Sequence, residues 1–221
     1  NTTADNNTAF GYNSLQANTT GTQNVAVGAL ALDAATTAHS NTAIGYNSLG
    51  ANTTGAENVA LGMQALQDNT TASYNTAIGT QALRLNTTGT KNTAVGSNTL
   101  DANTTADHNS ALGYNALTNN TTGASNTAVG DRALQANTTQ SNNVAIGYRT
   151  LINQTVADQN TAVGADAMYT NTTGEYNTAM GYMSLYNNTT AANNTALGYQ
   201  ALLANTTGAQ NIAVGRGAMA S

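Results

Sequence analysis

The chain has 221 residues, a net charge of −5, only 7% charged residues, and no cysteine, proline or tryptophan. Its five lysines and arginines cannot supply the dense basic surface that nucleic-acid phosphates require, so we expect no nucleic-acid partner. No stretch approaches the roughly 20 apolar residues of a membrane span, and the missing cysteines exclude a disulfide framework.

One 17-residue unit repeats thirteen times and fills the chain. Every unit contains Asn-x-Ala-φ-Gly, where φ is apolar, and its glycine recurs every 17 residues from Gly11 to Gly215. Positions 1–17 of the unit are counted here from the start of the chain, so that Gly11 occupies position 11. We expect one continuous array over residues 1–221. Because neither end carries an atypical capping unit, we expect it to be a segment of a longer fibre.

The unit opens on Asn-Thr-Thr, which we predict to be an exposed turn, since Asn and Thr side chains bond to nearby backbone. Ala35 and Gln154 replace the asparagine in two units, and this tolerance favours an exposed site. Each Asn-Thr-Thr also matches the acceptor pattern for N-linked sugar. The alternative is that Asn and Thr simply build a good turn and a polar ladder. The candidate acceptors are Asn1, Asn18, Asn52, Asn69, Asn86, Asn103, Asn120, Asn137, Asn171, Asn188 and Asn205.

Position 4 alternates between alanine and glycine, from Ala4 and Gly21 onward, until Gln140 breaks the phase. Two explanations stay open. Glycine lets alternate turns take a positive φ, or packing against a neighbour repeats every second coil.

The Asn-x-Ala-φ-Gly segment predicts a first short strand, and the Ala/Ser-Leu pair of positions 14 and 15 a second. Seventeen residues are too few for helical repeats, and the apolar positions lack a helical period. The predicted fold class is therefore all-β: a parallel β-solenoid (β-roll) with 13 coils of 17 residues and two short strands per coil.

Alternation along the strands predicts two apolar core stripes. One is position 15, from Leu15 to Leu202 with Met168 and Met219 as exceptions. The small residues Ala9 and Gly11 and their equivalents are then expected on the opposite face, closely covered by another chain, another sheet or a bend. The other stripe is the φ position: Phe10, Val27, Ile44, Leu61, Ile78, Val95, Leu112, Val129, Ile146, Val163, Met180, Leu197 and Val214.

Position 7 is asparagine in every unit. Stacked amides that hydrogen-bond along the solenoid axis are the simplest explanation for such a column. The predicted ladder consists of Asn7, Asn24, Asn41, Asn58, Asn75, Asn92, Asn109, Asn126, Asn143, Asn160, Asn177, Asn194 and Asn211.

Catalytic and metal-binding constellations are not recognisable. His39 and His108 lie at variable turn positions, and the acidic residues form no recurrent pair. The aspartates are too sparse for repeated calcium cages. We therefore expect no enzyme activity, no cofactor and no metal site. A tyrosine recurs at position 12 and is expected to pack against its neighbours or to contact sugar: Tyr12, Tyr46, Tyr114, Tyr148, Tyr182 and Tyr199.

The segments NTAVG, NTAIG and NSALG, followed by Tyr-x-Ala-Leu, resemble the head repeats of trimeric autotransporter adhesins and the repeats of phage and bacterial tail-fibre-like proteins. The resemblance covers the whole chain, although the unit of those adhesins is shorter than the unit here. It implies a left-handed parallel β-roll, often trimeric, on an exported fibre that contacts surfaces.

The expected function is therefore a structural, non-catalytic segment of an extracellular fibre at the cell or virion surface, with an adhesive or coating role and with glycans as a candidate modification or ligand. Self-association, as a trimer or end to end, is the expected partnership. The alternative is an ice-binding or carbohydrate-binding solenoid. Thr8 and its equivalents recur at coil spacing, interrupted at Val25, Val59, Val144 and Ile212.

Overall fold

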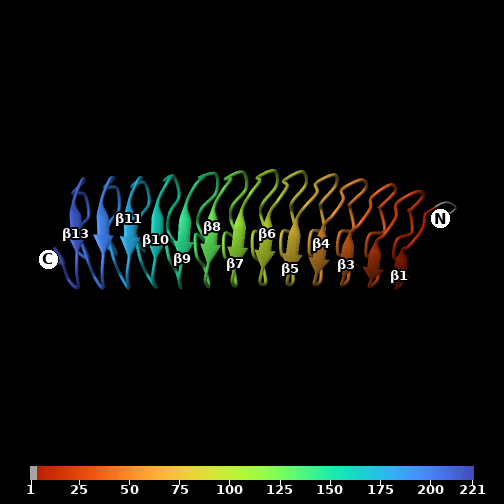
Figure 1. Ribbon diagram of the computed structural model, residues 1–221, viewed down its shortest axis with the longest axis horizontal. Helices are drawn as coiled ribbons and strands as arrows, with labels where there is room; N and C mark the ends of the chain where they lie inside the picture. Colours follow the sequence, from red (N-terminus) through yellow and green to blue (C-terminus); the bar gives the residue numbers. More distant parts are fainter. Residues whose placement is uncertain (1–3) are drawn as a thin grey trace. The chain divides into compact units, whose positions relative to one another are not determined.

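The computed structural model describes residues 4–221, and each coil contributes one three-residue strand to a parallel sheet (Figure 1). Contacts divide the chain into two compact units, residues 1–109 and 110–221. The first unit holds β1 (Thr8–Phe10), β2 (Val25–Val27), β3 (Thr42–Ile44), β4 (Val59–Leu61), β5 (Thr76–Ile78) and β6 (Thr93–Val95). The second holds β7 (Ser110–Leu112), β8 (Thr127–Val129), β9 (Val144–Ile146), β10 (Thr161–Val163), β11 (Thr178–Met180), β12 (Thr195–Leu197) and β13 (Ile212–Val214).

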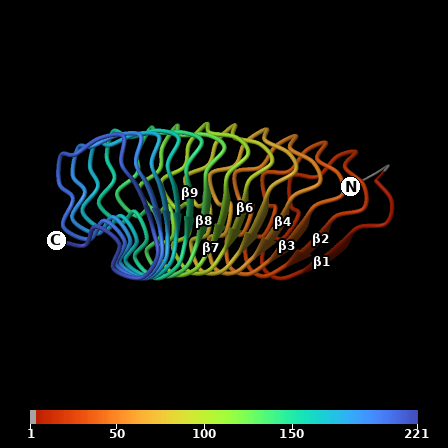
Figure 2. The same ribbon diagram turned by 60° about the vertical axis from the view of Figure 1, so that its left-hand side comes forward.

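Within each unit, consecutive strands pair in parallel and in register, so that each residue lies opposite its equivalent in the next coil. Thr42 lies opposite Val59, for example, and Thr161 lies opposite Thr178. Figure 2 shows successive turns of the chain following the same path within the second unit. The predicted parallel β-solenoid with a 17-residue coil is therefore confirmed.

The second strand of each coil, expected at positions 14 and 15, is replaced by a turn over positions 12–17. Three positions of the coil take a left-handed backbone, as Glu57, Gln64 and Leu66 show with φ of 56°, 59° and 51°. Residues at positions 13 and 15 in this conformation cannot continue a pleated strand. A leucine with positive φ is uncommon, and its side chain gives no signal of it in the sequence.

The turn still bonds to both neighbouring coils through its backbone. The N–H of Asn47 donates to the carbonyl O of Ala29 in the preceding coil (2.9 Å), and the N–H of Leu49 donates to Ala65 in the following coil (3.0 Å). Positions 2, 3, 6, 8, 11 and 17 make similar bonds between coils, as coils 2 to 5 illustrate. Proline lacks the N–H that these bonds use, which explains why the chain contains none.

The interior of the coil is lined by small residues and one leucine column. Between the first and last coils, the alanines of positions 4, 9 and 14 and the leucine of position 15 are buried, and Ala60, Ala65 and Leu66 have no exposed surface. The leucine stripe predicted for the core is therefore confirmed through Leu202, whereas Met219 in the last coil is 54% exposed.

The second predicted core stripe, at the φ position, is wrong. Ile44 is 37% exposed, Leu61 42% and Phe10 76%, because the alanine at position 9 points inward and its two strand neighbours must point outward. The affected residues are Phe10, Val27, Ile44, Leu61, Ile78, Val95, Leu112, Val129, Ile146, Val163, Met180, Leu197 and Val214, all half-buried or exposed. The alanine at position 9 is closely covered, as expected. The cover is the interior of its own coil, and no second chain is needed.

Most glycines of position 4 lie close to the backbone of the next coil. Gly21, Gly55 and Gly89 do not have a positive φ, so that explanation of the alternation is wrong. A Cβ on Gly55 would overlap the carbonyl O of Ala72 in the next coil and the Oδ1 of Asn52. At Gly21, Gly55 and Gly89, the backbone of the next coil therefore lies too close for a side chain.

The two stripes are distinguished by alanine substitutions in one coil. Leu49→Ala should lower the free energy of unfolding by about 2–5 kcal/mol, because it empties a fully buried site. Ile44→Ala should cost about 1 kcal/mol or less, because only a half-exposed strand position is changed. Urea unfolding of both variants tests this, and equal losses would contradict the assignment of faces.

The contact at position 4 predicts an unusual sign for a glycine substitution. Replacing glycine by alanine usually stabilises a chain by about 0.4–1 kcal/mol where the backbone allows it. Gly55→Ala should instead destabilise by about 1–3 kcal/mol through overpacking. Ala72→Gly in the next coil is the matched control, with an expected loss of about 0.5–1 kcal/mol. A stabilised Gly55→Ala variant would refute the proposed contact.

Candidate functional site

The outward side chains of the strands form the most extended regular surface of each unit. We define the strand face as positions 8 and 10 of each coil. In the first unit it comprises Thr8, Val25, Thr42, Val59, Thr76 and Thr93 beside Phe10, Val27, Ile44, Leu61, Ile78 and Val95. In the second unit it comprises Ser110, Thr127, Val144, Thr161, Thr178, Thr195 and Ile212 beside Leu112, Val129, Ile146, Val163, Met180, Leu197 and Val214.

The strand face carries no charged residue. A column dominated by threonine runs beside a fully apolar column, and parallel strands repeat about every 4.8 Å. Positions 6 and 12 flank it with mostly polar or aromatic side chains, such as Tyr74 and Tyr46, which are 55% and 51% exposed. Because position 10 accepts Phe, Val, Ile, Leu and Met, its size variation was a sequence signal that it does not fill a close-packed interior.

The asparagines of position 7 hydrogen-bond as a ladder requires. The Oδ1 of Asn41 accepts the backbone N–H of Asn58 in the next coil (3.0 Å), and the Nδ2 of Asn41 donates to the carbonyl O of Gly55 (2.9 Å). The same pair of bonds recurs in the second unit, for example at Asn160 with Asn177 (2.9 Å) and Gly174 (2.7 Å). These amides therefore join their coil to the next through both of their ends, whereas Asn194 does so through its Oδ1 alone, because its Nδ2 has no partner among the described residues.

Position 1 forms a second buried column, which is the polar ladder that stood as the alternative to an exposed site. The Nδ2 of Asn69 donates to the carbonyl O of Ala72 in its own coil (3.0 Å) and to the Oδ1 of Asn52 in the preceding coil (3.0 Å). Asn188 makes the equivalent bonds to Ala191 and Asn171, both 3.0 Å. The two columns share acceptors, because the carbonyl O of position 4 receives an N–H from each.

This burial corrects the expectation that position 1 is an exposed turn site. The Nδ2 atom to which an N-linked sugar attaches is enclosed in the folded coil and already donates hydrogen bonds. The candidate acceptor Asn1 lies outside the described residues. Asn205, in the last coil, is partly buried. The others are 0–3% exposed: Asn18, Asn52, Asn69, Asn86, Asn103, Asn120, Asn137, Asn171 and Asn188.

The two coils without asparagine at position 1 each lack at least one hydrogen bond of this column. Ala35 cannot donate to the Oδ1 of Asn18, and this buried oxygen finds no donor among the described residues. Gln154 keeps the bond to the carbonyl O of Ala157 (2.8 Å), but the Oδ1 of Asn137 before it is likewise unpartnered among residues 4–221. The tolerance at these sites reflects a local loss of bonding and not exposure.

Completing the column should stabilise the first unit. Ala35→Asn offers donors to the Oδ1 of Asn18 and the carbonyl O of Ala38, as Asn69 does in an equivalent coil. We expect a gain of about 1 kcal/mol in the free energy of unfolding. Asn69→Ala, the reverse change, should lose about 1–3 kcal/mol because it leaves a buried acceptor unsatisfied. Thermal and urea unfolding check both, and a destabilised Ala35→Asn variant would contradict the bonding scheme.

Ionisable groups serve mainly as links between coils. The guanidinium of Arg84 donates from Nε and Nη2 to both carboxylate oxygens of Asp101 (2.8 and 3.2 Å), and Arg149 does the same to Asp166 (2.9 and 3.1 Å). These bonds raise the pKa of each arginine. Burial raises the pKa of Asp33, against hydrogen bonds from backbone N–H groups that lower it.

These groups form no metal-binding cluster in the described part of the chain. Within residues 4–221, no three His, Cys, Asp or Glu side chains are grouped so that they could hold a metal ion. His39 and His108 are exposed at turn positions, as the sequence predicted. No helix among the described residues is long and apolar enough to cross a membrane.

The tyrosines of the second unit stack on one another. The rings of Tyr169 and Tyr186 lie 5.2 Å apart between centroids, and those of Tyr182 and Tyr199 lie 5.5 Å apart. The guanidinium of Arg149 lies over the ring of Tyr148 as well (4.7 Å). This agrees with packing between neighbours. Stacked rings cover each other's faces, which are the surfaces that a sugar would use.

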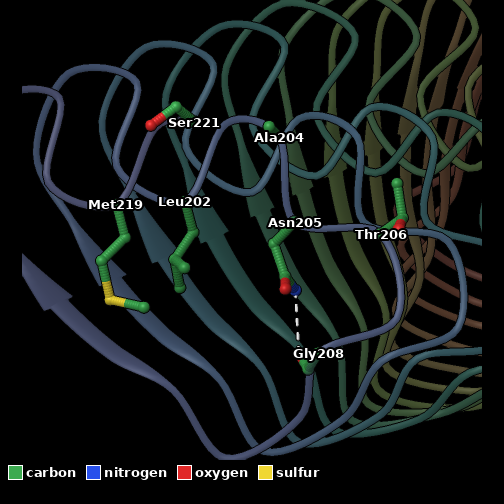
Figure 3. Close-up of a pocket in the computed structure, with 7 residues that line it drawn as sticks. All are labelled: Leu202, Ala204, Asn205, Thr206, Gly208, Met219 and Ser221. Carbon is green, nitrogen blue, oxygen red and sulfur yellow. Dashed lines mark hydrogen bonds between the residues drawn. The ribbon is translucent and has the colours of Figure 1, made fainter.

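A hollow of about 260 Å³ lies at the last coil of the second unit (Figure 3). Leu202 and Met219 point into it, and the Nδ2 of Asn205 donates to the carbonyl O of Gly208 beside it (2.9 Å). These residues belong to positions that face the interior in earlier coils. The hollow is therefore the open side of a coil interior and not a separately built ligand site.

Comparison with known proteins adds no relative. A scan of family models gave no match to this chain, and a search of curated proteins gave none either.

Proposed function

We propose that this chain is a structural, non-catalytic segment of an extracellular fibre, with an adhesive or coating role at a cell or virion surface. The observation that carries the proposal is the bonding of each coil to both neighbours. Backbone and asparagine bonds join equivalent positions of successive coils, so every coil is a copy of one load-bearing element.

The way charged residues are used supports a structural role. The closest acid–base pairs, Arg84 with Asp101 and Arg149 with Asp166, connect adjacent coils. A catalytic site needs a nucleophile, a base and an orienting group held together. Each of these two pairs instead consists of one arginine and one aspartate that bind each other. The residues that recur in every coil fill the interior or form bonds between coils.

An extracellular location suits the backbone of this chain. Proteases attack segments that open locally, and opening is rare where the backbone is bonded throughout. Each coil bonds its turn as well as its strand to the neighbouring coils. Such a chain tolerates exposure to proteases without disulfides, which its lack of cysteine excludes.

Self-association is part of the proposed role. Soluble monomers rarely leave large contiguous apolar patches exposed, and about 25% of the residues in a typical soluble domain are charged. This chain has 7% charged residues and an apolar column on its surface. Association of copies into a fibre fits both properties.

Surface labelling tests the location and role together. An antibody raised against the chain should label intact, unpermeabilised cells or particles of the source organism along filaments. Cells lacking the gene should lose both the label and their attachment to surfaces. Label that appears only after permeabilisation would refute the proposed function.

Ice binding is a second candidate, favoured by one observation. The threonines of position 8 point outward from the sheet, so the strand face presents hydroxyl and methyl groups at regular spacing. Val25, Val59, Val144 and Ile212 interrupt this column. A measurement of thermal hysteresis on the purified chain decides the matter: a freezing point equal to the melting point removes this candidate.

A further inference from the structure

The strand face is an apolar surface without a partner in either unit. Leu61, Ile146 and Met180 are 42%, 39% and 45% exposed, although residues of these types are usually buried. The face of a sheet that meets water usually carries polar side chains. Neither position 8 nor position 10 carries a charge in any coil.

The repeat restricts what can cover this face. Every coil offers the same two outward positions in register with the next. A partner can match all of them only if its own groups repeat with the spacing of parallel strands, about 4.8 Å. A second copy of this chain has that spacing by construction.

The area is sufficient for a stable contact when both units take part. Positions 7 to 11, which hold the strand and one residue on each side of it, span about 13 Å at roughly 3.3 Å per residue, and one coil adds about 4.8 Å along the sheet. The six coils of the first unit and the seven of the second then cover about 820 Å² per partner, or about 1,650 Å² in total, above the roughly 1,000 Å² expected of a specific interface.

The distribution of side chains also resembles an interface between proteins. Apolar side chains occupy its middle, and mostly polar or aromatic side chains flank it. The flanks bear both signs, with Glu57 and Lys91 in the first unit and Asp131 and Arg216 in the second. Two copies would therefore meet without an extended like-charge repulsion.

The varied sizes at position 10 favour a protein partner over a crystal surface. Phe10, Val27, Leu61 and Met180 differ in length, so their tips do not lie in one plane. A second sheet can interdigitate with such a surface, since stacked sheets pack about 10 Å apart with side chains between them. The flat surface of an ice crystal cannot interdigitate with side chains of different lengths.

We propose that the strand face is the surface through which two copies of this chain pack side by side, sheet against sheet. The inference rests on the proposed fibre function, because it names the contact by which copies associate. The aliphatic column of position 10 forms the middle of the contact, and positions 6 and 12 form its rim.

Matched charge substitutions test this contact. The face variant carries Ile44→Lys, Ile78→Lys, Ile146→Lys and Met180→Lys. The control carries Thr37→Lys, Thr71→Lys, Thr139→Lys and Thr173→Lys, which adds the same charges in the same coils at exposed position 3. Sedimentation equilibrium should give a mass of at least twice 22.4 kDa for the unaltered chain and for the control, and 22.4 kDa for the face variant.

Circular dichroism shows whether the face variant is folded, and methionine oxidation gives a measurement that needs no variant. Met180 lies on the strand face, whereas Met168 is fully buried in the coil. Peroxide should oxidise Met180 several-fold more slowly at high protein concentration than at low concentration. Met168 should react slowly at both.

Different results would refute the contact, assign the face to ice, or refute the fibre function. An unaltered chain that stays at 22.4 kDa at every concentration, with Met180 oxidised equally fast throughout, refutes the contact. Thermal hysteresis that the face variant loses would instead assign the face to ice. If the chain is monomeric but still labels the cell or particle surface, the contact is refuted and the fibre function is retained. If the chain assembles through this face but does not label the surface, the contact is retained and the fibre function is refuted.

Discussion

The hydrogen bonds of the asparagine at position 7 are the constraint on which the rest of the coil depends. Its amide accepts the backbone N–H of the next asparagine and donates to the carbonyl O of position 4 in that same coil. Both atoms are thereby fixed, which sets the distance between coils and brings position 4 of successive coils together. That close approach leaves no room for a Cβ at Gly55. The interior is small as well, because two amide columns and a leucine column leave room only for alanine beside them.

A polar interior of this kind is stable only when its hydrogen bonds are complete. A buried amide left without partners costs about 1–3 kcal/mol. Among the described residues, the first unit buries eleven asparagines, and the second buries nine asparagines and one glutamine. The repeat solves this by giving most of these amides the same partners in the neighbouring coils, with Asn18, Asn137 and Asn194 as exceptions at one atom each. The leucines supply the hydrophobic contribution, roughly 1.5–3 kcal/mol for each fully buried side chain. Stability therefore accumulates with the number of coils and depends little on any single one.

The sequence was enough to predict the repeat, the all-β class, the 17-residue coil, the leucine column and the asparagine ladder. Each rests on a strict periodicity that only one arrangement satisfies. The face of the φ residues was assigned wrongly, because alternation along a strand gives two faces but does not say which is inside. The size of the side chain at position 9 determines which face is inside. A coil with two asparagine columns has room for alanine there but not for valine or leucine. The second strand was also wrong, because the left-handed backbone of leucines such as Leu49 arises from bonds to both neighbouring coils and leaves no mark in the residue type.

The breaks in the position 1 column make the array mechanically uneven. Between Asn18 and Ala35, and again between Asn137 and Gln154, one bond that other coils share is missing. Under tension along the stack, coils separate first where the fewest bonds resist them. The first unit thus has a seam on each side of coil 3, because Ala35 offers neither a donor to Asn18 nor an acceptor to Asn52, and the second unit has one between coils 9 and 10. A fibre built from such units would yield by opening at these seams while the remaining coils stayed closed, so that it would extend in steps before it broke.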